Sequence, residues 1–170
     1  MITKELLRSL KPEIQDKVSA LLDFCQQSAL EILIYCTFRS FENQAKLYCQ
    51  GRTVDQIAVK AIELANIYHR DDLSQLLLAT KPQPGAIVTF AAPGQSLHNY
   101  GLAFDAVPVA NGKLIWGNTS PEERKLWQLY GKLGRKAGLD WAGNWRKFRE
   151  YPHLQMPNAD WRELIVVGEE

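Results

Sequence analysis

Apolar residues recur every three to four positions from Pro12 to about Ser28, which is the spacing of one face of an amphipathic helix. The next segment, residues 31–37, is a run of β-branched and aromatic side chains with the length of a strand. Ser40 is placed to cap a following helix that Gly51 ends. The first third of the chain therefore predicts a helix, a strand and a second helix.

The middle of the chain indicates two more helices. One covers residues 53–65 and starts with a Thr-x-x-Gln capping box, and the other runs over residues 71–79 behind a pair of aspartates. Residues 81–85, Lys-Pro-Gln-Pro-Gly, stop any helix. We expect a buried strand over residues 86–90 and a loop over residues 91–100.

The second half of the chain begins with alternating apolar residues over positions 102–109, which predict a strand. Asn111-Gly112 is a type I′ hairpin signal that connects this strand to residues 113–116. Residues 120–137 form the most complete helix signal, with an N-cap serine, proline at the first position and a capping-box glutamate. A last strand is expected near residues 164–167. The fold class is α+β, with a central antiparallel sheet flanked by helices.

The length and the net charge of the chain limit the number of domains and the kinds of partner that we expect. A chain of 170 residues has the size of one domain, so we expect a single domain over 1–170 and a monomer. Twenty Lys and Arg against nineteen Asp and Glu leave a net charge of +1, which argues against a nucleic-acid partner. The longest nearly unbroken apolar run, residues 32–38, is far shorter than the about 20 residues of a membrane span.

The beginning of the chain lacks the charged, apolar and small-residue pattern of a secretory signal. We therefore expect synthesis in the cytoplasm without a signal peptide. Cys25, Cys36 and Cys49 are odd in number and contain no C-x-x-C pair, so neither a disulfide framework nor a four-cysteine zinc site is expected. We interpret them as small apolar side chains in a reducing compartment.

Two of the three histidines lie in polar, turn-rich segments rather than on apolar helix faces. His98 precedes Gly101, which allows a sharp turn into the strand that carries Asp105, so these two side chains can face each other across the turn. His153 follows Pro152, which excludes a helix and places His153 in a strand end or turn.

Two imidazoles and one carboxylate, with a fourth position open to water, are typical of catalytic zinc sites. Glu150, three residues before His153, is placed to act as a base on that water. Hydrogen-bonded loop histidines and a solvated Glu150 are the alternative, which spacing alone does not exclude. We interpret His69, at a predicted helix end, as a helix-terminus cation rather than a ligand.

These residues belong to a longer pattern, Ser96-x-His98-x-x-Gly101-x-Ala103-x-Asp105 followed about fifty residues later by Glu150-x-Pro152-His153. It resembles the signature of the zinc D-alanyl-D-alanine carboxypeptidase and L-alanyl-D-glutamate endopeptidase family. The segments around the signature resemble the L-alanyl-D-glutamate branch, which includes phage endolysins and bacterial wall-remodelling peptidases. Those segments are residues 37–48, 51–53, 93–96 and 138–145.

The resemblance implies a hedgehog-like or D,D-peptidase-like fold, a Zn²⁺ cofactor and bacterial peptidoglycan as the partner. The implied reaction is hydrolysis of the L-Ala–D-Glu bond of the stem peptide by Glu-assisted attack of zinc-bound water, after the enzyme has been released to the wall. The implied roles are zinc ligation by His98, Asp105 and His153, acid–base catalysis by Glu150, and binding of substrate carboxylate and oxyanion by Arg39. The resemblance implies more weakly that Ser96 and Gln44 contact the substrate or order a loop.

Several alternatives stay open at this stage. Ser96 is equally a turn former, Gln44 a helix-surface residue and Arg39 a surface arginine, while Trp141, Trp145 and Tyr151 could line a groove or belong to the core. The chain departs from the branch in the longer stretch 54–83, in Ala142 and Asn144, and in Glu150 where Asp is frequent. The alternative functions are D-Ala-D-Ala carboxypeptidase activity and a non-catalytic zinc-binding domain.

Overall fold

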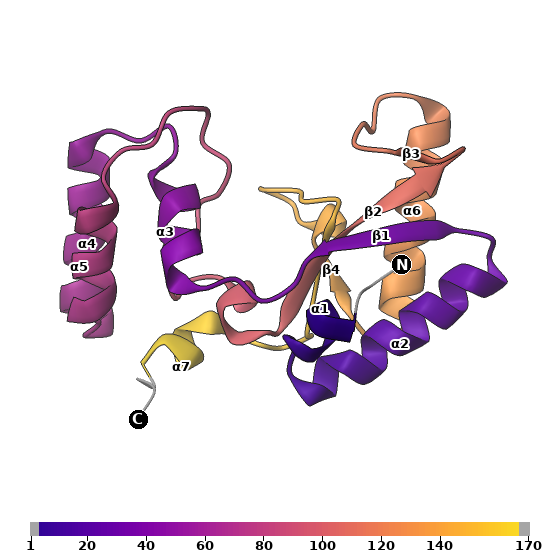
Figure 1. The fold of residues 1–170 in the computed structure, drawn as a ribbon, viewed down its shortest axis with the longest axis horizontal. Helices are drawn as coiled ribbons and strands as arrows, with labels where there is room; N and C mark the ends of the chain where they lie inside the picture. The colour runs from indigo at the N-terminus through magenta and orange to yellow at the C-terminus, as the bar shows by residue number, and fades with distance from the viewer. Residues whose placement is uncertain (1–3, 167–170) are drawn as a thin grey trace. The chain divides into compact units, whose positions relative to one another are not determined.

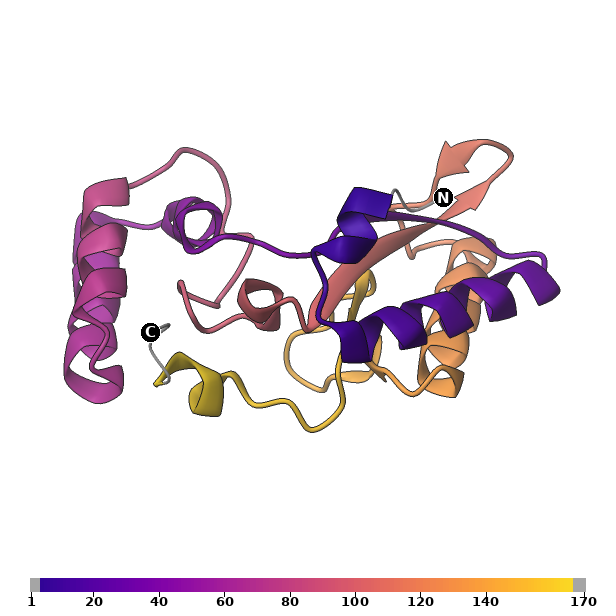
Figure 2. The same cartoon turned by 60° about the horizontal axis from the view of Figure 1, so that its bottom comes forward.

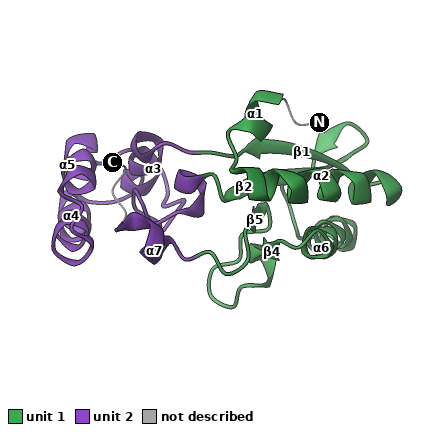
Figure 3. Cartoon of the chain, turned by 90° about the horizontal axis from the view of Figure 1, so that it is seen from below, with its two compact units in different colours: residues 1–38, 101–159 green, residues 39–100, 160–170 purple. Residues whose placement is uncertain are grey.

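The computed structural model describes residues 4–166, and the chain forms two compact units, each assembled from separate stretches (Figure 3). Unit 1 lies within residues 1–38 and 101–159, and unit 2 within residues 39–100 and 160–170. Across residues 4–166, no helix combines the length and apolar character needed to cross a membrane.

Unit 1 is built on a sheet of five strands in the order β1-β2-β5-β4, with β3 paired to β2 (Figures 1 and 3). Each of these pairings is antiparallel, which confirms the predicted sheet. Asn111 and Gly112 both have positive φ, as the predicted type I′ turn between β2 and β3 requires. The strands are β1 Glu31–Cys36, β2 Ala103–Ala110, β3 Lys113–Leu114, β4 Asp140–Trp141 and β5 His153–Gln155.

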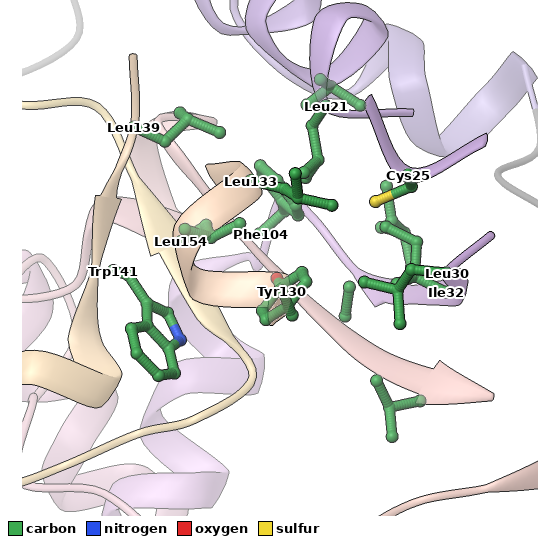
Figure 4. Close-up of a cluster of buried hydrophobic side chains, with 14 of the residues drawn as sticks. Leu21, Cys25, Leu30, Ile32, Phe104, Tyr130, Leu133, Leu139, Trp141 and Leu154 are labelled. Atoms are coloured by element: carbon green, nitrogen blue, oxygen red, sulfur yellow. The ribbon is translucent and has the colours of Figure 1, made fainter. Parts of the chain in front are cut away.

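Two long helices contribute side chains to the same buried core as this sheet. They are α2, Pro12–Gln27, and α6, Pro121–Lys136, both close to their predicted ranges, and α6 has the predicted capping box between Ser120 and Glu123. Leu21 of α2, Tyr130 of α6 and Phe104 of β2 lie in one buried cluster (Figure 4). Shorter helices in this unit are α1, Lys4–Arg8, and the 3-10 turn η2, Ala142–Asn144.

Gly101 shapes the entry into β2. Its φ is +65°, in the left-handed region that favours glycine, and its carbonyl accepts a hydrogen bond from the Lys11 amide at 2.9 Å. A Cβ at this position would meet the Ser9 carbonyl oxygen at 3.0 Å. The predicted sharp turn is therefore present, and both its φ and its close packing favour glycine.

Unit 2 is helical. Ser40 and Thr53 cap the first two of its helices with their side chains, as predicted, and the Thr53–Gln56 capping box is complete. The helices share a buried cluster that includes Tyr48, Leu64 and Leu77. The elements are α3 Phe41–Cys49, α4 Val54–Tyr68, α5 Asp71–Thr80, the 3-10 turn η1 Leu97–Tyr100 and α7 Trp161–Ile165.

Two predicted strands are wrong. Residues 86–90 form an exposed or half-exposed loop, because the described part of unit 2 contains no sheet edge for them to join; side chains of Gln50 and Arg52 bind their carbonyls instead. The strand expected near 164–167 is replaced by α7, whose N-cap Asp160 accepts a hydrogen bond from the Arg162 amide. Residue 167 lies outside the described residues.

Candidate metal centre

Asp105 and His153 lie opposite each other on β2 and β5. A carboxylate oxygen of Asp105 is 3.2 Å from Nδ1 of His153, and the two side chains are 14% and 9% exposed. Ligand atoms about 2.1 Å from a tetrahedral zinc ion lie about 3.4 Å from each other. The spacing and the chemistry of this oxygen–nitrogen pair therefore fit two ligands of one zinc ion.

The other ring nitrogen of His153 has its own partner. Nε2 lies 3.0 Å from Oε1 of Gln155, two residues further along β5. Because an amide oxygen only accepts, this contact fits the tautomer with its proton on Nε2, which is the tautomer whose Nδ1 can bind a metal ion. Gln155 was missed in the sequence, although the two-residue period of a strand puts it on the same face as His153.

The backbone before His153 is held by three donors from the core. The Trp141 indole N–H donates to the Tyr151 carbonyl at 2.8 Å. The Tyr130 hydroxyl and the Ala106 amide both donate to the Pro152 carbonyl, at 2.9 and 3.1 Å. These bonds fix the position from which His153 leaves the turn.

Tyr130 remains a donor because it stays protonated. Its burial raises the pKa of the phenol well above the ordinary value, and the carboxylate of Asp105 raises that pKa further. The hydroxyl therefore keeps its proton throughout the range in which proteins are normally active.

Glu150 occupies the start of the same turn. Its carbonyl accepts from the His153 amide at 3.2 Å, and its carboxylate oxygen Oε2 lies 4.0 Å from His153 Nδ1, with the side chain 32% exposed. A carboxylate that stays in contact with solvent next to a ligand pair can exchange protons with water.

The three candidate aromatic residues around this turn differ in how far they are exposed. Trp141 is buried in the core and Tyr151 is partly buried against it. Trp145 is 38% exposed, and its ring centroid lies 5.6 Å from that of His153. Trp145 is thus the one of the three that borders the Asp105–His153 pair with an exposed face.

Cys36 is less buried than its interpretation as a small apolar side chain implies. Cys25 and Cys49 are buried thiols, and burial raises the pKa of Cys25 to about 11. Cys36 is only partly buried and pairs with Asp105 across a register shift between β1 and β2. Its sulfur lies within 4.8 Å of a carboxylate oxygen of Asp105, a proximity that no spacing in the sequence could indicate.

His98 and Arg39 belong to unit 2, where their backbones are hydrogen-bonded. The Arg39 amide donates to the His98 carbonyl at 3.0 Å, and the Asn99 side-chain amide donates to the Arg39 carbonyl at 2.8 Å. Asn99 also accepts from the Gly94 amide at 3.0 Å through its Oδ1. Asn99, buried and overlooked in the sequence, therefore holds the turn that carries His98 against residue 39.

The structure also places the remaining candidate residues, which are Gln44, Ser96 and His69. Gln44 is fully buried, so the alternative of a helix-surface residue is wrong. The Ser96 carbonyl accepts from the Asn99 amide at 2.9 Å, which makes Ser96 part of the η1 turn. His69 is the C-cap of α4, with φ of 55°, at the helix end where it was predicted.

Unit 1 thus brings together Asp105, Glu150 and His153, and unit 2 joins the backbones of Arg39 and His98. Two candidate ligands beside a partly exposed carboxylate match the pattern of a catalytic rather than a structural metal site. The α+β fold and these candidate residues are those expected of a metal-dependent hydrolase.

Comparison of the sequence with known proteins gives the family. Residues 90–156 match a family described as D-alanyl-D-alanine carboxypeptidase, of the M15 peptidases. The chain is 31% identical over 154 residues to the peptidoglycan L-alanyl-D-glutamate endopeptidase CwlK of Bacillus subtilis (strain 168), covering 88% of this chain and 75% of CwlK. The chain therefore belongs to the zinc D-alanyl-D-alanine carboxypeptidase and L-alanyl-D-glutamate endopeptidase family, and the resemblance found in the sequence is confirmed.

Solved structures agree on the fold. The L-Ala D-Glu endopeptidase ChiX of Serratia marcescens matches with a TM-score of 0.50 and 18% identity, over 90% of this chain and 84% of ChiX. A mutant of the vancomycin resistance D,D-pentapeptidase VanY, in complex with Zn(II), matches with a TM-score of 0.51 and 16% identity, over 86% of this chain and 72% of VanY. The predicted D,D-peptidase-like α+β fold is confirmed.

Proposed function

We propose that this zinc peptidase hydrolyses the bond between L-Ala and D-Glu in the stem peptides of bacterial peptidoglycan. The observation that carries the proposal is the 31% identity to CwlK over 88% of the chain, since CwlK is named for that bond. The pairing of Asp105 with His153 at 3.2 Å, with Glu150 beside them, supports a hydrolytic site in this chain.

In this proposal His98, Asp105 and His153 hold Zn²⁺. Support for Asp105 and His153 comes from their fit to two ligands of one ion and from the Gln155 contact that directs Nδ1. Support for His98 comes from its place in the Ser-x-His-x-x-Gly-x-Ala-x-Asp pattern and from its buried position in a hydrogen-bonded turn.

Zinc, when bound, supplies Lewis acidity that acidifies water and polarises the scissile carbonyl. Glu150 takes the proton of the attacking water and returns it to the leaving amine of D-Glu. Arg39 binds the free carboxylate next to the scissile amide and the negative charge that develops on the carbonyl oxygen, because a guanidinium is permanently charged and can bind carboxylate bidentately. Ser96 contributes a weaker substrate contact.

We further propose that residues 1–170 act as one zinc peptidase domain, because the residues of the signature fall in both compact units. Peptidoglycan is then the macromolecular partner, and the bacterial cell wall is the place of action.

The second candidate function is D-Ala-D-Ala carboxypeptidase activity, which the description of the matching family favours. Arg39 does not separate the two reactions, because the α-carboxylate of γ-linked D-Glu and the terminal carboxylate of D-Ala occupy similar positions relative to their amides. A non-catalytic zinc-binding domain is disfavoured, since binding alone would require neither Glu150 nor Arg39.

Digestion of purified cell wall tests the scissile bond. We expect mass spectrometry to show stem fragments with a new amino-terminal glutamate, and D-Ala-D-Ala to be cleaved poorly or not at all. Glu150→Gln protein, digested in parallel, serves as the control for contaminating hydrolases. Free D-alanine as the main product would instead assign the protein to the carboxypeptidase reaction.

Removal of the Gln155 amide should weaken zinc binding. Gln155→Ala leaves His153 free to change its tautomer and ring orientation, and loss of such an outer partner typically lowers metal affinity about 10- to 100-fold. Competition with a chelator measures the affinity, with Gln128→Ala on the exposed side of α6 as the matched control. An affinity equal to that of the wild type would show that Gln155 does not orient His153.

A further inference from the structure

Gln44 in α3 is a fully buried glutamine whose amide is engaged at both ends. Its oxygen Oε1 accepts a hydrogen bond from Nη1 of Arg39 at 2.9 Å. Its nitrogen Nε2 donates to the Ala91 carbonyl at 2.7 Å. One planar group therefore joins the Arg39 guanidinium to the main chain of residue 91.

The two partners together require an amide at this position. A guanidinium only donates and a carbonyl only accepts, so the group between them must offer one acceptor and one donor. Glutamate would keep the acceptor for Arg39 but would turn an oxygen towards the Ala91 carbonyl. Methionine has a similar length and supplies no comparable partner to either group.

Arg39 is thereby held at both its backbone and its side chain. The Asn99 side chain and the His98 carbonyl bind the backbone of residue 39, and Gln44 binds its guanidinium. An arginine side chain has many rotamers, and ordering it before the substrate arrives removes an entropic cost from the reaction.

We propose that Gln44 is a positioning residue: it holds the Arg39 guanidinium in one orientation and does not itself contact the substrate. The inference rests on the proposed role of Arg39 in binding the substrate carboxylate and oxyanion. Gln44 is fully buried, and both ends of its amide already bind internal partners, so the amide is not presented to a ligand. The effect of replacing Gln44 must therefore pass through Arg39.

A double-mutant cycle tests this dependence. Gln44→Met, Arg39→Ala and the double variant are compared by kcat and KM on wall stem peptides. We expect Gln44→Met to lower kcat/KM about 10- to 100-fold, since a misplacement of about 1 Å has effects of this size. In the Arg39→Ala background, Gln44→Met should change kcat/KM by less than about twofold, because the two residues act as one unit.

Gln50→Met is the matched control. Gln50 follows α3 and donates from Nε2 to the Ala86 carbonyl at 3.0 Å, so it also ties α3 to the following loop, but from a different position along the helix than Gln44. We expect its kcat/KM to stay within about twofold of the wild type. An equal loss in Gln44→Met and Gln50→Met would show that only the loop tether matters and would overturn the proposal.

Two further results separate the possible failures. If the kcat/KM losses of the two single variants multiply in the double variant, the role of Gln44 alone is overturned. If kcat/KM is unchanged in Arg39→Ala, Arg39 is not part of the site, and the proposed function of Arg39 is overturned too. If thermal unfolding shows that Gln44→Met does not fold, Gln44→Glu replaces it. That variant keeps the acceptor for Arg39 and should retain more activity than Arg39→Ala; a loss as large as that of Arg39→Ala would contradict the proposal.

Discussion

His98→Ala protein is expected to contain no stoichiometric zinc and to hydrolyse cell wall no faster than the uncatalysed background. The imidazole is one of three proposed zinc ligands, and the two that are left do not hold the ion. Without the ion, the Lewis acidity that it supplies to the reaction is lost as well. The change should spare the local backbone, because the His98 carbonyl that accepts from the Arg39 amide is still present in alanine.

Metal analysis of the purified variant, together with its circular dichroism spectrum, measures this effect. His69→Asn is the matched control, because residue 69 is the C-cap of α4 in the left-handed conformation, which asparagine tolerates. The control should bind one zinc per chain. Full zinc loading of His98→Ala would remove His98 from the ligand set.

Glu150→Gln is expected to keep its zinc and its fold but to lose about 10²- to 10⁴-fold in kcat, the usual contribution of a positioned general base. The amide has nearly the shape of the carboxylate, so the turn held by Trp141 and Tyr130 should not change. What disappears is the group that takes a proton from water and returns it to the leaving amine.

Glu150→Asp is the informative companion variant. It keeps the carboxylate and shortens its reach by one methylene, so its kcat should lie between those of the wild type and Glu150→Gln. Steady-state kinetics and metal analysis on the same preparations check both variants. Activity of Glu150→Gln within about twofold of the wild type, against the expected effect of a general base, would place the base elsewhere.

The sequence by itself determined the elements whose signals are local. The capping boxes at Thr53 and Ser120 are present at the predicted helix starts, and Asn111-Gly112 forms the predicted turn, because caps and turns depend on residues within a few positions of each other. It also singled out Asp105, Glu150 and His153, which share one turn and two neighbouring strands. The motif spacing made them candidates for one site, while hydrogen-bonded loop histidines and a solvated Glu150 stayed open as the alternative.

Only the tertiary structure decided the features that depend on distant partners. Residues 86–90 have the composition of a strand but form a loop, because a strand requires a neighbouring edge and the described part of unit 2 has none. The burial of Gln44 and its contact with Ala91, 47 residues away, follow from how α3 packs. The register that sets Asp105 against His153 is likewise a property of the assembled sheet, since pairing between strands is decided by which faces the core buries and not by the residues of either strand alone.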